Sequence, residues 1–171
     1  MWPAVAGGCV VLGVWWIVRV LPDAFVVPVF CRVPAEVAAQ YYNAALQLPE
    51  LAFAVRGLTV EVIRPCGATD FFSMVTGLFV YLCLCRENGS RRRSPSRLHF
   101  LAVLPLAWVF TIIANTIRII LLVPVKGWVY HHPFLGRIHL DDRLGTIVFL
   151  SLFMLLWEGV RRYVTRNKNA E

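Results

Sequence analysis

Four long apolar runs, separated by polar or mixed segments, dominate the hydrophobic pattern of the chain. A helix needs about 20 largely apolar residues to cross the hydrocarbon core of a bilayer. Runs that approach this length lie at residues 2–21, 66–85, 100–123 and 144–163. Tyr, Trp and Arg residues near their ends are typical of side chains at a membrane interface. The pattern predicts an all-α membrane protein with four transmembrane helices.

Two strongly basic segments orient these spans. One is the loop RENGSRRRSPSRLH at residues 86–99, and the other is the tail RRYVTRNKNAE at residues 161–171. Basic segments beside transmembrane helices stay on the cytoplasmic side of a membrane. We therefore expect a multi-pass protein of the cytoplasmic (inner) membrane with both termini in the cytoplasm. Residues 22–65 and 124–143 then lie outside.

The outer segment at residues 22–65 has a pattern of its own. An amphipathic surface helix is indicated by a stripe of residues at near-helical spacing, namely Val37, Tyr41, Ala44 and Leu48. Residues 58–62 alternate between apolar and polar side chains, which predicts a short strand. The sequence thus adds a surface helix and a strand-like segment between the first two spans.

The composition limits the remaining classes of protein. The chain has 171 residues, of which 58% are hydrophobic, so we expect a single integral-membrane domain over residues 1–171. The net charge of +7 is concentrated beside the spans and is not interleaved with stacking aromatic residues, which argues against nucleic acid as a partner. The five cysteines include no CxxC pair.

One charge lies within the third apolar run. Arg118 interrupts the stretch NTIRIILLV, where an arginine costs about 2.5–3.5 kcal/mol at the centre of a membrane helix. The neighbouring apolar residues offset this cost but do not explain the charge. Ionisable residues inside a membrane usually face protein or a water-filled cleft, so Arg118 is a candidate functional residue.

The predicted topology brings three reactive groups to the outer end of the bundle. Cys66 begins the second span there, Arg118 lies in the outer third of the third span, and His139 precedes the fourth. A thiol, an imidazole for general acid–base chemistry and a guanidinium for a developing oxyanion suffice for thiol acyl transfer. Asn115 lies one helical turn before Arg118 and can donate to the same oxyanion.

Each of these residues also has a simpler interpretation. Cys66 can be a small buried hydrophobe, and Arg64 can either favour its thiolate or anchor the helix at the interface. His131 and His132 compete with the neighbouring histidine for an acid–base role. Asp70, expected to be buried, can pair with the intramembrane arginine in a purely structural ion pair.

At these positions the chain resembles the exosortase/archaeosortase family of integral-membrane cysteine enzymes. The matching motifs are RPCGATDFF with Cys66, ANTIRI with Asn115 and Arg118, and IHLDDRLG with His139 and Gly145. The strand-like run before the cysteine is also similar, and the short length is similar to the compact branch exosortase K. The resemblance extends roughly over residues 51–158.

The resemblance implies a cysteine transpeptidase or protease that processes exported proteins. Its substrates would carry a C-terminal sorting signal, consisting of a short motif, a transmembrane helix and a basic tail. Cys66, Arg118 and His139 would be catalytic, with Asn115, Arg64 and Gly67 supporting the substrate or oxyanion. The Cys66 thioester would pass to an unknown acceptor nucleophile or to water, and neither a metal nor an organic cofactor is needed.

Two other functions remain open at the level of sequence. Cys31 and Cys66 are both expected outside, where they can form the redox pair of a thiol–disulfide membrane oxidoreductase. Alternatively, Arg118 can hold an anionic headgroup in a non-enzymatic lipid-binding membrane subunit.

Overall fold

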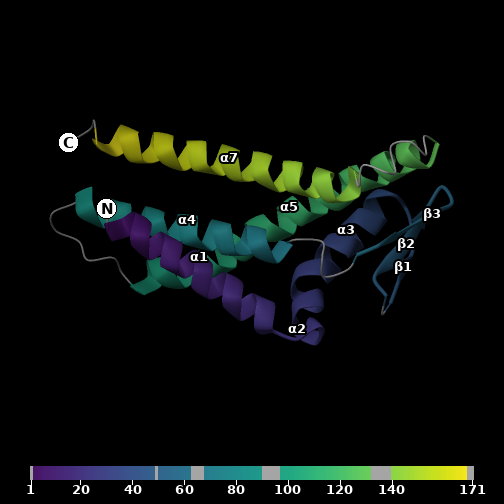
Figure 1. The fold of residues 1–171 in the computed structure, drawn as a ribbon, viewed down its shortest axis with the longest axis horizontal. Helices are drawn as coiled ribbons and strands as arrows, with labels where there is room; N and C mark the ends of the chain where they lie inside the picture. The colour runs from purple at the N-terminus through teal and green to yellow at the C-terminus, as the bar shows by residue number, and fades with distance from the viewer. Residues whose placement is uncertain (1, 49, 63–67, 90–96, 132–139, 169–171) are drawn as a thin grey trace. The chain divides into compact units, whose positions relative to one another are not determined.

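The computed structural model describes residues 2–48, 50–62, 68–89, 97–131 and 140–168, and most of them are helical (Figure 1). The long helices are α1 (Trp2–Val20), α4 (Ala68–Gly89), α5 (Arg97–His131) and α7 (Leu140–Lys168). Stretches long and apolar enough to cross a membrane occur in each of them, at Trp2–Val20, Ala68–Cys85, Leu101–Val129 and Arg143–Tyr163. Each predicted span therefore overlaps one long helix.

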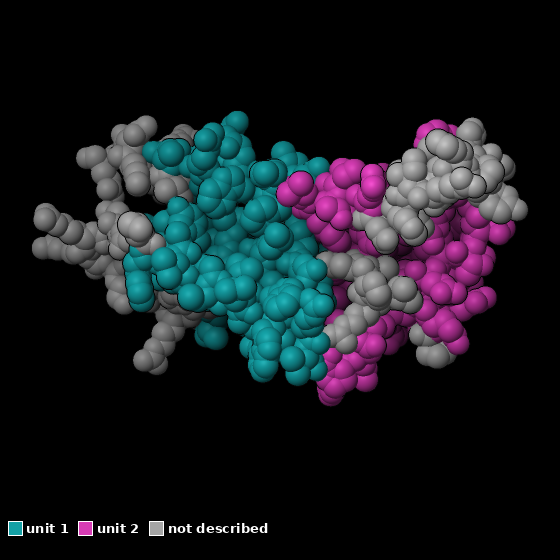
Figure 2. Space-filling model, in the orientation of Figure 1, with its two compact units in different colours: residues 1–20, 69–111, 151–171 teal, residues 21–68, 112–150 magenta. Residues whose placement is uncertain are grey.

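The chain divides into two compact units, each made of separate stretches of sequence (Figure 2). Unit 1 comprises Met1–Val20, Thr69–Thr111 and Ser151–Glu171, and unit 2 comprises Leu21–Ala68 and Ile112–Leu150. Both α5 and α7 contribute residues to each unit. Unit 2 also contains the shorter helices and a small sheet, all of which lie between α1 and α4 in the sequence.

Unit 1 contains a close helix crossing at two glycines. Gly7 on α1 and Gly77 on α4 are both buried. A Cβ atom at Gly77 would collide with the side chain of Val11 and would lie 2.9 Å from the Gly7 carbonyl oxygen. Small residues allow two apolar helices to approach closely, which gives van der Waals packing where lipid removes the hydrophobic driving force. The two glycines therefore set the α1–α4 contact.

The third long helix extends further than the hydrophobic pattern predicts. The expected end at Val123, with Pro124 beginning an outer loop, is wrong, because α5 continues through Pro124 to His131. Proline has no N–H to donate to the carbonyl four residues earlier, here that of Ile120. The Tyr42 hydroxyl donates to this Ile120 oxygen at 2.7 Å. A side chain from elsewhere in unit 2 thus supplies the donor that the proline lacks.

We expect Tyr42→Phe to lower the free energy of unfolding by about 1–3 kcal/mol, because the partly buried Ile120 carbonyl loses a donor. Burial, with the neighbouring Tyr41, raises the pKa of the Tyr42 hydroxyl, so the donor proton is present at neutral pH. Denaturant titration in detergent measures the change. Tyr41→Phe is the matched control, because Tyr41 is 64% exposed. Equal losses in the two variants would contradict this role for Tyr42.

The segment after α1 is helical but interrupted. It consists of α2 (Asp23–Val27), a π-helical turn η1 (Pro28–Arg32) and α3 (Val33–Tyr41). At the end of α3, Asn43 has a φ of 51° and donates its N–H to Gln40, while Ala44 donates to Ala39. A left-handed residue with these two backbone bonds is the Schellman motif that commonly ends helices. Asparagine adopts this conformation more readily than most residues, so α3 ends here.

A helix is present where the surface helix was predicted, but only half of the predicted stripe lies on it. Two of its members, Ala44 and Leu48, lie beyond the end of α3, while Val37 and Tyr41 are exposed. The buried face of α3 is instead formed by small residues, Pro34, Ala35, Ala38 and Ala39. Small side chains allow the helix backbone to approach its neighbours closely. The helix is therefore packed through alanines rather than through its larger apolar residues.

The expected strand-like segment is confirmed and belongs to a three-stranded antiparallel sheet. Its strands are β1 (Leu46–Gln47), β2 (Ala52–Val55) and β3 (Leu58–Glu61), in the order β1-β2-β3. Phe53 pairs with Val60, and both side chains are fully buried. The predicted alternation holds in β3, where Val60 is buried while Thr59 and Glu61 are exposed. One face of the sheet therefore belongs to the core of unit 2.

Candidate functional site

Arg118 is buried within unit 2, with 7% of its surface exposed. Its guanidinium carbon lies 5.8 Å from the centre of the Phe149 ring on α7. A cation over an aromatic face gains up to about 2 kcal/mol when it is removed from water. The ring therefore offsets part of the cost of burying this charge, and it holds the guanidinium beside α7.

Gly145 on α7 leaves space for the same guanidinium. A Cβ atom at this position would lie 2.5 Å from Arg118 Nε and 3.2 Å from its Cζ. Any side chain at residue 145 would therefore displace Arg118. The glycine of the IHLDDRLG motif and the arginine of the ANTIRI motif, which are far apart in sequence, are in contact in unit 2.

We expect Gly145→Ala to destabilise the protein by about 1–3 kcal/mol, since overpacking forces the buried arginine from its position. Thermal and denaturant unfolding in detergent measure this loss. Gly159→Ala on the same helix is the control, because a Cβ there meets no described atom within 4 Å. That control should gain about 0.5–1 kcal/mol from better helix propensity. A gain at both positions would show that Gly145 does not limit the space around Arg118.

Asn115 shares a face of α5 with Arg118, one turn earlier, and is fully buried. Its amide nitrogen donates to the carbonyl oxygen of Phe30 in the π-helical turn at 3.1 Å. The nitrogen carries a second hydrogen. Its buried Oδ1 accepts no hydrogen bond from the residues that the structure describes. Asn115 thus ties η1 to α5 and retains hydrogen-bonding capacity beside Arg118.

Asp70, the carboxylate expected as a structural partner for Arg118, is not buried. It lies in the first turn of α4 and is exposed. A carboxylate near the N-terminus of a helix is favoured by the helix dipole, which gives Asp70 a local role. The expectation that it is a buried residue is therefore wrong.

The remaining predicted site residues lie outside the described part of the chain. They are Arg64, Cys66, Gly67, His132 and His139. The described chain resumes two residues after Cys66, at the start of α4, and directly after His139, at the start of α7. His131 is the last residue of α5.

The other cysteines are distributed over both units. Cys31 is buried in the π-helical turn of unit 2, one residue after the carbonyl that binds Asn115. Cys9 is exposed on α1, and Cys83 and Cys85 are half-buried on α4. Within the described ranges, no three His, Cys, Asp or Glu side chains gather closely enough to hold a metal ion.

The sequence did not reveal two contacts of this site. Phe149 and Gly145 lie about 30 residues after Arg118, on a different helix, and no local pattern connects them with it. The only signal was the position of Gly145 in the IHLDDRLG stretch, one of the motifs on which the resemblance in the sequence analysis was based. Comparisons with known protein families, with characterised proteins and with solved structures found no match for this chain.

Proposed function

We propose that this protein is a membrane-embedded cysteine transpeptidase or protease that cleaves C-terminal sorting signals of exported proteins. Cys66 is the nucleophile, His139 the general acid and base, and Arg118 the group that stabilises the oxyanion. The observation that carries the proposal is the buried arginine in the apolar stretch of α5, which contacts Gly145 and Phe149 on α7. A fixed, buried cation can stabilise negative charge that develops beside it during a reaction.

The division of the chain into units supports grouping these residues. Unit 2 contains Arg118, together with Ala68, two residues after Cys66. It also contains Leu140, which directly follows His139. The described chain next to each proposed catalytic residue therefore belongs to the same compact unit as the buried guanidinium.

The reaction uses these side chains in two steps. The Cys66 thiolate attacks the scissile carbonyl carbon, and the carbonyl oxygen becomes an oxyanion stabilised by Arg118. The tetrahedral intermediate collapses to a thioester as the C–N bond breaks, and His139 protonates the departing amine. An acceptor amine, hydroxyl or water then attacks the thioester, loses its proton to His139 and releases the Cys66 thiolate, which restores the starting state.

The proposed topology explains why the substrate carries a transmembrane helix. Both termini and the basic loop at residues 86–99 lie in the cytoplasm, and Cys66 is at the extracytoplasmic end of its helix. A substrate helix in the same bilayer presents its preceding motif at that surface. Its basic tail stays on the cytoplasmic side, which fixes the depth of the scissile bond.

The proposal is tested by comparing the C-termini of exported proteins in host cells with and without this protein. Loss of the protein should leave a set of exported proteins longer by an apolar helix and a basic tail, as measured by mass spectrometry. Restoring the wild-type chain should restore the shorter forms. Identical C-termini in the two strains would refute the proposal, and a change only in disulfide content would instead favour an oxidoreductase.

A further inference from the structure

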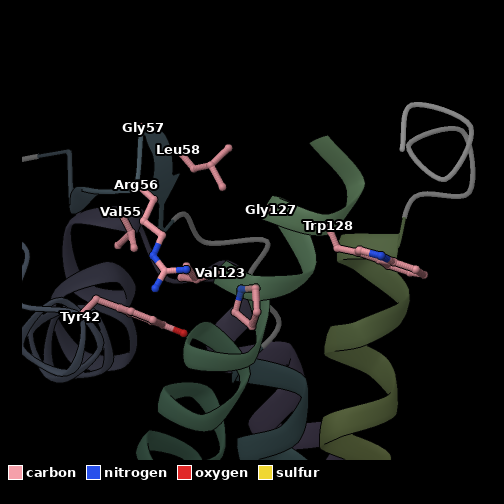
Figure 3. Close-up of a pocket in the computed structure, with 9 residues that line it drawn as sticks. Tyr42, Val55, Arg56, Gly57, Leu58, Val123, Gly127 and Trp128 are labelled. Atoms are coloured by element: carbon pink, nitrogen blue, oxygen red, sulfur yellow. The ribbon is translucent and has the colours of Figure 1, made fainter. Parts of the chain in front are cut away.

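Unit 2 contains a pocket of about 670 Å³ between the β2–β3 turn and the last turns of α5 (Figure 3). It is separate from the contact between Arg118 and α7. Its lining is largely apolar and comprises Tyr42, Val55, Arg56, Gly57, Leu58, Val123, Pro124, Gly127 and Trp128. The volume lies in the range of about 300–1,000 Å³ that is usual for small-molecule sites.

Among the lining residues that the structure describes, Arg56 is the one that carries a charge. It occupies the two-residue turn between β2 and β3, where Arg56 and Gly57 have φ angles of 50° and 81°. Two positive φ angles are the geometry of the turn that matches the twist of a tight hairpin. Figure 3 shows the Arg56 side chain extending from this turn toward Val123. The hairpin thus places a cation beside apolar lining residues of α5 such as Val123 and Pro124. These apolar residues form what we call the apolar wall of the pocket.

The other polar groups of the pocket do not neutralise this charge. The described part of the chain contributes no carboxylate to the lining. The Tyr42 hydroxyl already donates its proton to the Ile120 carbonyl oxygen. Arg56 is exposed, so its donors are accessible from the pocket. An occupant that complements this lining has an anionic group for Arg56 and an apolar part for the wall.

The position of the pocket along α5 identifies the kind of occupant. Its α5 residues, Val123–Trp128, are at the C-terminal end of the apolar stretch Leu101–Val129. If this stretch crosses a bilayer, its end lies at the level of the lipid headgroups. Tryptophan is enriched at that level, which agrees with Trp128 in the lining. Phosphate groups and the first acyl carbons meet at the same depth.

We propose that this pocket binds an anionic phospholipid, with Arg56 bonded to the phosphate and the apolar wall against the upper acyl chain. Guanidinium groups bind phosphate through paired, charge-assisted hydrogen bonds. A water-soluble phosphate satisfies Arg56 but leaves the apolar wall in contact with water, so the intact lipid is the better ligand. The inference does not depend on Cys66 chemistry.

The test is native mass spectrometry of the full chain in detergent, titrated with phosphatidylglycerol or phosphatidylcholine. We expect preferential binding of phosphatidylglycerol, and a loss of about fivefold in its affinity for Arg56→Gln. Arg56→Lys keeps the charge and should retain most of the preference. Arg32→Gln removes the same charge from unit 2 but outside the pocket, where Arg32 pairs with Glu36 at 2.9 Å, and should bind as wild type does.

Three results would overturn the inference. The first is an unchanged affinity in Arg56→Gln, and the second is an equal loss in Arg56→Gln and Arg32→Gln, which indicates a general charge effect. The third is competition by glycerol 3-phosphate as strong as that by the intact lipid, which makes the ligand a soluble phosphate. Because binding is measured without turnover, each of these outcomes leaves the proposed peptidase function untouched.

Discussion

Arg118→Lys is expected to reduce cleavage of the sorting signal by about 100- to 1,000-fold while the protein still inserts and folds. The guanidinium is planar and lies close to both the Phe149 ring and Gly145 on α7. Lysine supplies the same charge as a compact ammonium on a flexible chain, and it does not reproduce the paired donors. The measurement is the single-turnover rate on a tail substrate in detergent or liposomes, with unfolding midpoints recorded in parallel.

Arg19→Lys is the matched control for this substitution. Arg19 lies on α1 in unit 1 and also covers an aromatic ring, with its guanidinium carbon 4.8 Å from the centre of the Trp15 ring. We expect this variant to cleave at nearly the wild-type rate. If Arg118→Lys also retains normal activity, the arginine acts only as a charge. Binding of a lipid headgroup would then explain it better than stabilisation of an oxyanion.

Cys66→Ala is expected to abolish cleavage, by about 10⁴-fold or more, because removal of a nucleophile leaves only binding and electrostatic stabilisation. The substrate should still bind, since the substitution removes a single sulfur atom. Accumulation of the uncleaved substrate, measured with equal amounts of wild-type and variant protein in the membrane, gives the effect.

Cys31→Ala separates the peptidase from the oxidoreductase. Cys31 is buried in the π-helical turn, where it is the other cysteine expected on the outer side of the membrane. A peptidase should keep its activity when this thiol is removed, apart from a modest loss of stability. A redox pair needs both sulfurs, so equal loss of activity in Cys31→Ala and Cys66→Ala would contradict the peptidase mechanism.

The long helices could be predicted because each carries its own signal in a continuous apolar run. The end of α5 could not, because it depends on a contact distant in sequence. Pro124 normally weakens a helix, and α5 continues with a hydrogen bond from Tyr42 to the Ile120 carbonyl. Nothing within residues 100–123 indicates that a tyrosine 78 positions earlier in the chain provides this donor.

In the outer segment at residues 22–65, the apolar spacing and the backbone conformation of one residue favour different ends for the helix. Apolar spacing predicted one helix that included Ala44 and Leu48, but a left-handed Asn43 ends α3 first. The strand, by contrast, was predictable because alternation at residues 58–62 requires only that one face of a sheet be buried. Asn43 was the sequence signal for the end of α3, but the apolar spacing continues past it and favoured a longer helix.

The candidate site was predictable in part. A charge inside an apolar run identified Arg118 as a residue that faces protein, and the structure buries it. Its contacts with Phe149 and Gly145 depend on the packing of α7 against α5 within unit 2. Such packing is set by the summed shapes of two helices, so it leaves no local pattern in either sequence.

Trapping the covalent intermediate on Cys66 would show whether this residue is the nucleophile. The wild-type protein is incubated with a tail substrate, quenched in acid and digested, and the peptide that contains Cys66 is analysed by mass spectrometry. If Cys66 is the nucleophile, this peptide carries the N-terminal part of the substrate as a thioester that hydroxylamine removes. Cleavage of the substrate without any adduct on Cys66, or with an adduct that hydroxylamine leaves intact, would contradict that role.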